Sequence, residues 1–226
     1  MIEYVFLDLD DTILDFKKSE YIAIGKTMSD YGVEPTDALR RRYHEINKWH
    51  WEQLELGKLT RPQVLEGRFA AFFGELGVQV DASEVAENYM QNLSAGHDFL
   101  PGAEEATERL SKKYRLFLAS NGTAYVQHRR MTDANLYRFF EVVFVSEEIG
   151  HNKPTKAYFE KCFARIPGFD VSKAVMVGDS LSSDIQGGIN AGMKTVWVNP
   201  SRGVGKIKAD YEIESLTQLE ALLETM

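Results

Sequence analysis

The chain has 226 residues, of which 44% are hydrophobic and 27% are charged, and its net charge at neutral pH is −8. This length and composition allow a substantial buried core in one large domain or two smaller ones. The acidic balance argues against a nucleic-acid polymer or an anionic membrane as partner, but it permits a small phosphorylated substrate where local cations offset the repulsion. The single cysteine, Cys162, excludes an internal disulfide and is expected to be a small apolar core residue. With no signal-like or membrane-spanning apolar run, we expect a cytoplasmic protein.

The N-terminal half begins with a strand and continues as helices. The apolar run Tyr4–Leu9 ends at carboxylates and is typical of a buried strand. From residue 19 to residue 92 the sequence is helical in character and rich in aromatics, with breaks near residues 29–32 and 57–59. Thr60 followed by Arg61 and Pro62 predicts the start of a helix.

After Pro101 short apolar strands alternate with helical segments. The predicted strands are 116–119, 142–145, 174–177 and 195–198, and the predicted helices are 103–113, 124–136, 155–165 and 185–191. This alternation favours βαβ units and a buried parallel sheet. Ligands of such sheets bind beyond the carboxyl ends of the strands.

Polar residues concentrate at those carboxyl ends. They are Asp8, Asp10, Asp11 and Thr12 after the first strand, Ser120, Asn121 and Gly122 after the second, Lys153 beyond the third, and Asp179 and Asp184 after the fourth. One polar turn after a strand is ordinary, but four of them indicate a shared site.

Four of these residues, Asp8, Asp10, Asp179 and Asp184, would form an acid-rich pocket if the strand ends converge. Two carboxylates about 4 Å apart repel by roughly 4 kcal/mol at an effective dielectric near 20, so the group needs protons or a cation. Oxygen ligands without paired His or Cys favour Mg²⁺. Any one of these acids alone would more often be a strand-end turn residue or a helix cap.

Asp8 and Asp10 lie two apart on an extended segment and can project to the same side of the sheet. One carboxylate could then attack phosphorus while the other donates a proton to the leaving oxygen and later activates water. Asp11 alternates away and is more simply a solvated or capping acid. The Thr12 hydroxyl could fix the loop.

Ser120, Asn121 and Gly122 precede a helical segment rather than a partner strand, so a hydroxyl and backbone N–H groups could cradle phosphate there. Lys153 precedes Pro154, which predicts an extended lysine followed by proline in the first helical turn. Its ammonium would then lie close to transferring phosphoryl oxygens.

These residues resemble, in order and spacing, the four motifs of the haloacid dehalogenase superfamily. The resemblance rests on Asp8-Leu9-Asp10-Asp11-Thr12, Ser120, Lys153 and the run from Gly178 to Asp184, and it covers nearly the whole chain. It implies an α/β fold, with a Rossmann-like, doubly wound parallel sheet as the core and an inserted all-helical cap. The implied catalytic core is residues 1–16 and 98–226, and the implied cap is residues 17–97.

The same resemblance implies roles for these residues. Asp8 would be the nucleophile and Asp10 the general acid/base, while Ser120 and Lys153 would hold the phosphoryl group. Mg²⁺ would be coordinated by Asp8, the backbone carbonyl of Asp10 and Asp179. Asp184 would act through a metal-bound water or by orienting Lys153.

A narrower resemblance points to pyrimidine nucleotides. The stretches SNGTAYVQHRR, VSEEIGHNKPTKAYFE and MVGDSLSSDIQGGINAGMKTVWVN resemble the bacterial pyrimidine 5′-nucleotidase branch. It implies a nucleoside 5′-monophosphate as the small-molecule partner. Aromatic residues of the helical segment could stack on a base, although packing is the commoner role at helical spacing. They are Tyr43, Trp49 and Trp51, beside His44 and His50. Gln127 and Arg130 are either buried or line the cleft between core and cap.

Four other functions fit parts of the pattern. A phosphosugar phosphatase or a phosphosugar mutase of the same superfamily would use the same two aspartates. A dehalogenase needs neither Asp10 nor a metal cluster. A receiver-like phospho-acceptor module also combines acids, a hydroxyl and a lysine, but it has no need of a leaving-group acid or of a long insertion, because loops in α/β units are usually about 2–6 residues long.

Overall fold

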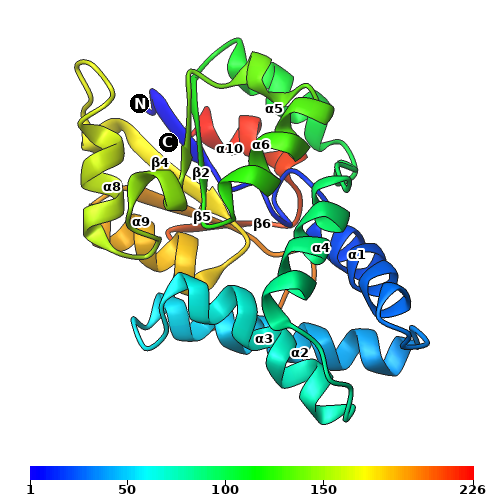
Figure 1. Cartoon of the computed structure of the whole chain (residues 1–226). Helices are drawn as coiled ribbons and strands as arrows, with labels where there is room; N and C mark the ends of the chain where they lie inside the picture. Colours follow the sequence, from blue (N-terminus) through cyan, green and yellow to red (C-terminus); the bar gives the residue numbers. More distant parts are fainter. The chain divides into compact units, whose positions relative to one another are not determined.

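The computed structural model describes residues 1–226, and the chain forms two compact units (Figure 1). One unit, here the α/β unit, comprises Met1–Asp15 and His97–Met226, and the other, the helical unit, comprises Phe16–Gly96. Both divisions lie one residue before the predicted boundaries of residues 17–97. No helix combines the length and the apolarity that crossing a membrane requires.

The α/β unit contains one six-stranded sheet in which every neighbouring pair of strands is parallel. Its strands are β1 (Tyr4–Leu7), β2 (Arg115–Ser120), β3 (Val142–Val145), β4 (Ala174–Gly178), β5 (Lys194–Val198) and β6 (Tyr211–Ile213). The spatial order β3-β2-β1-β4-β5-β6 is that of a doubly wound Rossmann-like sheet. The predicted fold class is therefore confirmed, and the order reverses between β1 and β4.

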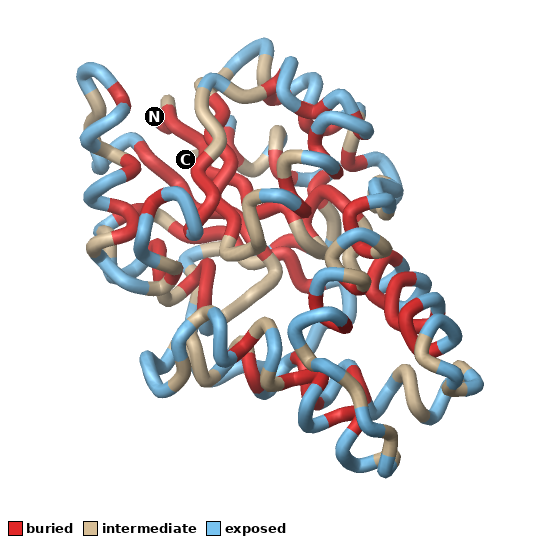
Figure 2. The backbone as a smooth tube through the Cα atoms, viewed as in Figure 1, coloured by how far each residue is buried: buried red, intermediate tan, exposed pale blue.

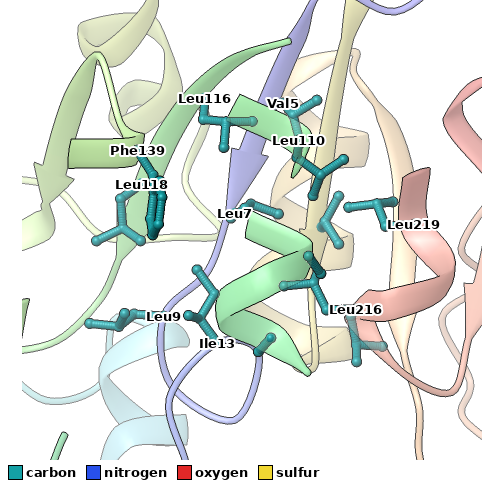
Figure 3. Close-up of a cluster of buried hydrophobic side chains, with 14 of the residues drawn as sticks. Val5, Leu7, Leu9, Ile13, Leu110, Leu116, Leu118, Phe139, Leu216 and Leu219 are labelled. Carbon is teal, nitrogen blue, oxygen red and sulfur yellow. The ribbon is translucent and has the colours of Figure 1, made fainter. Parts of the chain in front are cut away.

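Alternate residues of the strands build two hydrophobic cores, because successive side chains of a strand point to opposite faces. Val5 and Leu7 of β1 join the core shown in Figure 3, which is closed by α5 (Ala103–Ser111), α6 (Ala124–Asp133) and α10 (Leu219–Leu223). Figure 2 shows the strands as buried along most of their length.

Tyr4 and Phe6 face the opposite core, which α8 (Lys156–Phe163) closes and against which α9 (Gln186–Ala191) packs. Cys162 is fully buried in this core, where burial raises the pKa of its thiol to about 12. The cysteine is therefore a packing residue, as predicted.

The helical unit consists of α1 (Phe16–Asp30), α2 (Asp37–Glu55), α3 (Arg61–Glu75) and α4 (Ala82–Ser94), with α1 packed on α4 and α2 on α3. Its interior is aromatic: Tyr43 is fully buried and contacts Phe69, Phe72 and Tyr89. The predicted start of a helix at Thr60 is confirmed, and the Gln63 side chain accepts a hydrogen bond of 2.9 Å from the Thr60 N–H.

Two local predictions were wrong, and one strand was missed. The helix expected over 124–136 ends at Asp133, and a short 3₁₀ helix follows over Leu136–Phe139. Pro154 lies before α8 rather than in its first turn, since Thr155 is the cap residue and the Lys153–Pro154 peptide is cis. Strand β6 was missed because a three-residue edge strand carries almost no periodic signal.

Candidate active site

The predicted site residues come together at the carboxyl ends of the strands, beside the reversal of strand order. Asp8 follows β1, Ser120 ends β2, and Asp179 follows β4. Since β1 lies between β2 and β4, these three positions are on neighbouring strands. This is the place where open parallel sheets bind ligands.

Lys153 ties two of the acids together. Its Nζ donates to Asp8 Oδ1 at 2.7 Å, to Asp184 Oδ1 at 2.6 Å and to the Ala119 carbonyl at 2.5 Å. The side chains of Lys153, Asp8 and Asp184 are all buried, and those of Lys153 and Asp184 are only 1% exposed. An ammonium group has three N–H bonds, so these acceptors use all of them. Lys153 therefore holds Asp8 and Asp184 in place.

Burial and charge act against each other on this pair. Burial raises the pKa of Asp8, the Lys153 ammonium lowers it, and the Asp184 and Asp10 carboxylates raise it, so that the net shift is upward. Burial lowers the pKa of Lys153, but Asp184 and Asp8 outweigh this effect and the net pKa is raised. Lys153 therefore stays protonated, but its single positive charge does not fully offset the negative charge of the carboxylates around it.

The loop after β4 is shaped to receive Asp184. Asp184 Oδ2 accepts a hydrogen bond of 3.0 Å from the Ser180 N–H. A Cβ atom on Gly178 would lie 2.2 Å from the same oxygen, so only glycine fits there. Both oxygens of Asp184 are therefore engaged, and its carboxylate plane is fixed.

Asp8, Asp179 and Asp184 offer carboxylate oxygens that all lie within 4.8 Å of one another. With Asp10 nearby, four acids face only two buried cations, Lys153 and Arg130. The donors are oxygen atoms without His or Cys, the set that suits Mg²⁺. The residues present therefore fit a divalent cation on both donor chemistry and charge.

The Asp10 carboxylate is not part of this cluster, and its two oxygens contact helix α6 instead. Oδ2 accepts a hydrogen bond of 2.7 Å from Gln127 Nε2, and Oδ1 accepts one from the Arg130 guanidinium. Asp10 thus lies on the same loop as Asp8, but its side chain is held by a different group of residues.

The three residues at the end of β2 and directly after it make different hydrogen bonds, although they are adjacent in the chain: Ser120, Asn121 and Gly122. Ser120 Oγ accepts hydrogen bonds from the Gly122 N–H at 3.1 Å and from Gln127 Nε2 at 2.8 Å. The Asn121 side chain accepts from the Lys153 N–H at 2.8 Å and donates to the Lys153 carbonyl at 2.9 Å. The Asn121 amide therefore anchors the lysine segment. Helix α6 begins at Ala124, as predicted, and the Ala124 N–H donates a hydrogen bond of 2.7 Å to Glu147 Oε2.

The loop between β1 and α1 is closed by its backbone. Leu14 N–H donates to Leu9 C=O at 2.9 Å, and Asp11 N–H donates to Leu14 C=O at 2.8 Å. Asp11 adopts a φ of 55°, a left-handed conformation that Asp tolerates better than most residues. The Thr12 hydroxyl is buried without a hydrogen-bond partner, so it does not fix the loop as we expected.

The aromatic residues proposed to contact a base have different environments. Tyr43 is fully buried in the helical unit, so of the two alternatives it has the packing role, the commoner one at helical spacing. His50 is buried and its Nδ1 contacts the Ile46 carbonyl at 2.8 Å. Trp49 is 52% exposed, and Trp51 has the Arg61 guanidinium over its ring.

Comparison with known proteins identifies the family. The haloacid dehalogenase-like hydrolase family matches residues 5–198, most of the chain. The chain belongs to the haloacid dehalogenase-like hydrolases. YfnB of Bacillus subtilis, described as a hydrolase of this family, is 37% identical over 221 residues, which cover 97% of this chain and 94% of YfnB. The crystal structure of YfnB bound to magnesium aligns with a TM-score of 0.94 at 36% identity and covers 99% of both chains.

Two further relatives of this hydrolase are pyrimidine 5′-nucleotidases. PynA of Streptococcus pneumoniae is 34% identical over 220 residues, which cover 96% of this chain and 93% of PynA. YjjG of Escherichia coli is 29% identical over 223 residues, which cover 98% of this chain and 97% of YjjG. Each match runs through both the α/β unit and the helical unit.

Sequence reasoning left the placement of two residues of this hydrolase undecided. Gln127 and Arg130 are 1% and 0% exposed and both contact Asp10. Their spacing of three residues places them on one face of α6, a signal visible in the sequence. Nothing in the sequence alone says that this face is directed at Asp10 rather than at solvent.

Proposed function

We propose that this protein is a Mg²⁺-dependent phosphomonoester hydrolase that works through an aspartyl-phosphate intermediate. The observation that carries the proposal is the position of Asp8: a buried carboxylate at the end of β1, held by Lys153 and grouped with Asp179 and Asp184. A carboxylate whose orientation is fixed beside cationic groups is suited to attack an anionic phosphoryl group.

In the first step a carboxylate oxygen of Asp8 forms a bond to phosphorus while the bond to the ester oxygen breaks. The electron pair of the broken bond goes to the ester oxygen, which takes a proton from the Asp10 carboxyl and leaves as an alcohol. The Ser120 hydroxyl donates a hydrogen bond to a phosphoryl oxygen, and the Lys153 ammonium offsets the negative charge that gathers around Asp8.

In the second step Asp10, now ionised, takes a proton from water. The water oxygen attacks phosphorus, the bond to Asp8 breaks, and its electron pair returns to the Asp8 carboxylate. Asp10 regains its proton, so the net reaction converts a phosphate ester and water into an alcohol and inorganic phosphate. A phosphosugar mutase would use the same first step and return phosphate to a sugar hydroxyl.

Asp8, Asp179 and Asp184, together with the backbone carbonyl of Asp10, would hold Mg²⁺. When bound, the cation supplies positive charge that offsets the carboxylates and the incoming phosphate. The magnesium in the YfnB crystal structure supports this assignment. Lys153 already holds Asp8 and Asp184 by hydrogen bonds, and the contacts of Asp184 with Ser180 and Gly178 restrict its movement.

The substrates we propose are pyrimidine nucleoside 5′-monophosphates. Support comes from PynA and YjjG, pyrimidine 5′-nucleotidases whose similarity extends over both units of this chain. We further propose that the helical unit, residues 16–96, is the cap that selects the substrate. A phosphosugar phosphatase with the same catalytic residues is the alternative within the family.

Asp8→Asn tests the covalent mechanism. An amide keeps the shape of the side chain but is a very poor nucleophile, so phosphate release in the presence of Mg²⁺ should stop while the folded state persists. Phosphate release from UMP should be measured with purified wild-type and variant proteins, with circular dichroism as the check on folding.

The matched control is Asp11→Asn, the same chemical change three residues along the loop. Asn also tolerates the left-handed conformation of residue 11, so this variant should remain active. Retention of more than a few per cent of the wild-type rate by Asp8→Asn would show that Asp8 is not the nucleophile.

A further inference from the structure

Helix α6 presents two buried polar side chains to the catalytic loop. Gln127 Nε2 donates to Asp10 Oδ2 at 2.7 Å and to Ser120 Oγ at 2.8 Å. Arg130 donates to Asp10 Oδ1, and its Nη1 also donates to Gln127 Oε1 at 3.0 Å. Neither residue would touch the reacting atoms in the proposed mechanism, yet each contacts a residue that would.

The hydrogen bonds determine which way the Gln127 amide points. Its NH₂ group has two hydrogens, one for Asp10 and one for Ser120, and its carbonyl oxygen accepts from Arg130. A flipped amide would place its NH₂ group against the guanidinium, two donors facing each other, and would take the hydrogen-bond donor away from Ser120. Arg130 therefore fixes the amide, and the amide in turn fixes Asp10 and Ser120.

This arrangement also orients the Ser120 hydroxyl. A serine oxygen has two lone pairs, and here they accept from Gln127 Nε2 and from the Gly122 N–H. With both lone pairs used, the hydroxyl proton is left to donate to another acceptor. A phosphoryl oxygen is such an acceptor, and a charge-assisted hydrogen bond to it is among the stronger ones.

The position of the Gln127 amide also explains why residue 122 is a glycine. A Cβ atom at position 122 would lie 2.3 Å from Gln127 Nε2 and 2.5 Å from its Cδ. No left-handed φ requires glycine at this position, so space for the Gln127 amide is the reason that a side chain does not fit.

We propose that Gln127 and Arg130 are positioning residues that hold the Asp10 carboxyl and the Ser120 hydroxyl in one fixed geometry. Asp10 is thereby aimed as proton donor to the leaving oxygen while Ser120 receives the phosphoryl group. This inference rests on the proposed phosphohydrolase function and assigns the task of α6 within it.

Three aryl phosphates provide the test, namely phenyl, 4-nitrophenyl and 2,4-dinitrophenyl phosphate. Their leaving groups differ in acidity, so they need a proton from Asp10 to different extents. A misplacement of about 1 Å costs roughly 100-fold in rate, and general acid catalysis is worth about 10²- to 10⁴-fold. For Gln127→Leu we expect kcat/KM to fall about 100-fold on phenyl phosphate and about tenfold or less on the dinitrophenyl ester.

The proposed effect of Gln127 on Ser120 is tested separately, by measuring competitive inhibition by inorganic phosphate. Loss of the fixed hydroxyl donor should raise the inhibition constant about tenfold, which is the equivalent of one weakened hydrogen bond to an anion. Arg129→Met is the control, because Arg129 lies next to Arg130 on α6 but is exposed and pairs with Asp133 at 2.8 Å. It should leave all three rates and the inhibition constant unchanged.

A loss of folded protein alone would lower all three kcat/KM values by the same factor, and this result would overturn the inference. Gly122→Ala provides a second variant in case Gln127→Leu does not fold, because the new methyl group displaces the amide without removing it. It should show the same dependence on leaving group, and equal falls would again count against the inference. A wild-type enzyme that releases phosphate from no monoester would instead overturn the proposed function.

Discussion

At the scale of single residues, Lys153 connects several members of the candidate active site. Its ammonium contacts Asp8, Asp184 and the carbonyl of Ala119, while the Asn121 amide pairs with its backbone on both sides. The sequence predicted a lysine reaching toward the phosphoryl group. The structure adds that Lys153 also holds two buried carboxylates, so its removal has consequences for folding as well as for catalysis.

Lys153→Met should therefore destabilise the protein strongly. It leaves Asp8 and Asp184 buried without their cation, and loss of one partner of a buried pair costs about 3–5 kcal/mol. The free energy of unfolding in urea, measured with EDTA present, is the relevant quantity. Lys156→Met is the control, because Lys156 is exposed and its contact with Glu160 at 3.3 Å lies on the surface. A loss below about 1 kcal/mol for Lys153→Met, as for a surface pair, would contradict this account.

The acid cluster leads to a prediction about metal removal. Activity should disappear in EDTA and return with Mg²⁺, and Asp179→Ala should need far more Mg²⁺ for half-maximal activity. Loss of even an outer hydrogen-bond partner of a metal ligand lowers affinity by about 10- to 100-fold, so loss of one of three clustered carboxylates should do at least as much. Mg²⁺ titrations of activity and of the melting temperature measure this effect. Full activity after rigorous chelation would exclude the metal from the mechanism.

At the scale of elements, a polar chain ties three helices of the helical unit together. Glu20 of α1 contacts His44 of α2 at 2.5 Å and accepts from Asn47 at 2.6 Å, and Asn47 accepts from Arg68 of α3 at 2.7 Å. Glu20, Asn47 and Arg68 are buried, whereas His44 remains about half exposed. A buried carboxylate is thus satisfied by a histidine, a side chain whose charge depends on pH.

His44 should make the stability of this unit depend on pH. Its hydrogen bond to Glu20 raises the pKa of the imidazole above its ordinary value of 6.5. A raised folded-state pKa means that the stabilisation is fully present below 6.5 and is lost as the pH rises through the folded-state pKa. The difference in urea midpoint between wild type and His44→Gln should thus be largest at acid pH and shrink in alkali. His151→Gln, at an exposed position, should show no such trend, and a difference for His44→Gln that grows with pH would refute the assignment.

Helices and strands were predictable where a regular spacing of hydrophobic residues or a helix-capping residue marked them. Val142–Val145 was found to the residue, because a short run of β-branched and aromatic side chains bounded by polar residues has few alternatives. The helix expected over 185–191 is preceded by a π-helical turn over Leu181–Ile185. That turn brings Asp184 back toward Ser180, four residues earlier, and neither helix propensity nor hydrophobic period predicts a π-helical turn at this place.

At the scale of the whole molecule, the sequence predicted which residues lie close together but not which of them contact one another. βαβ connections make the strands parallel and place their carboxyl ends at one edge of the sheet, so the convergence of Asp8, Ser120 and Asp179 could be expected from their places at strand ends. The contacts of Gln127 could not, because the direction of a helix face depends on how α6 packs on the sheet. Tyr43 shows the same limit, since the sequence could not tell a core aromatic from an exposed one.

For the substrate, we expect pyrimidine nucleoside 5′-monophosphates to be preferred. The matches to PynA and YjjG extend across the helical unit as well as the α/β unit. Stacking of a base on an aromatic ring is worth about 1–3 kcal/mol, which would favour nucleotides over sugar phosphates by roughly one to two decades. Stacking tolerates any base, so discrimination against purines requires a size limit or hydrogen bonds to the base edge. Values of kcat/KM for UMP, dTMP, AMP and glucose 6-phosphate, with Mg²⁺ present, measure both preferences. If AMP or glucose 6-phosphate exceeded both pyrimidine nucleotides, the substrate assignment would fail, whereas the aspartyl-phosphate chemistry tested by Asp8→Asn would stand.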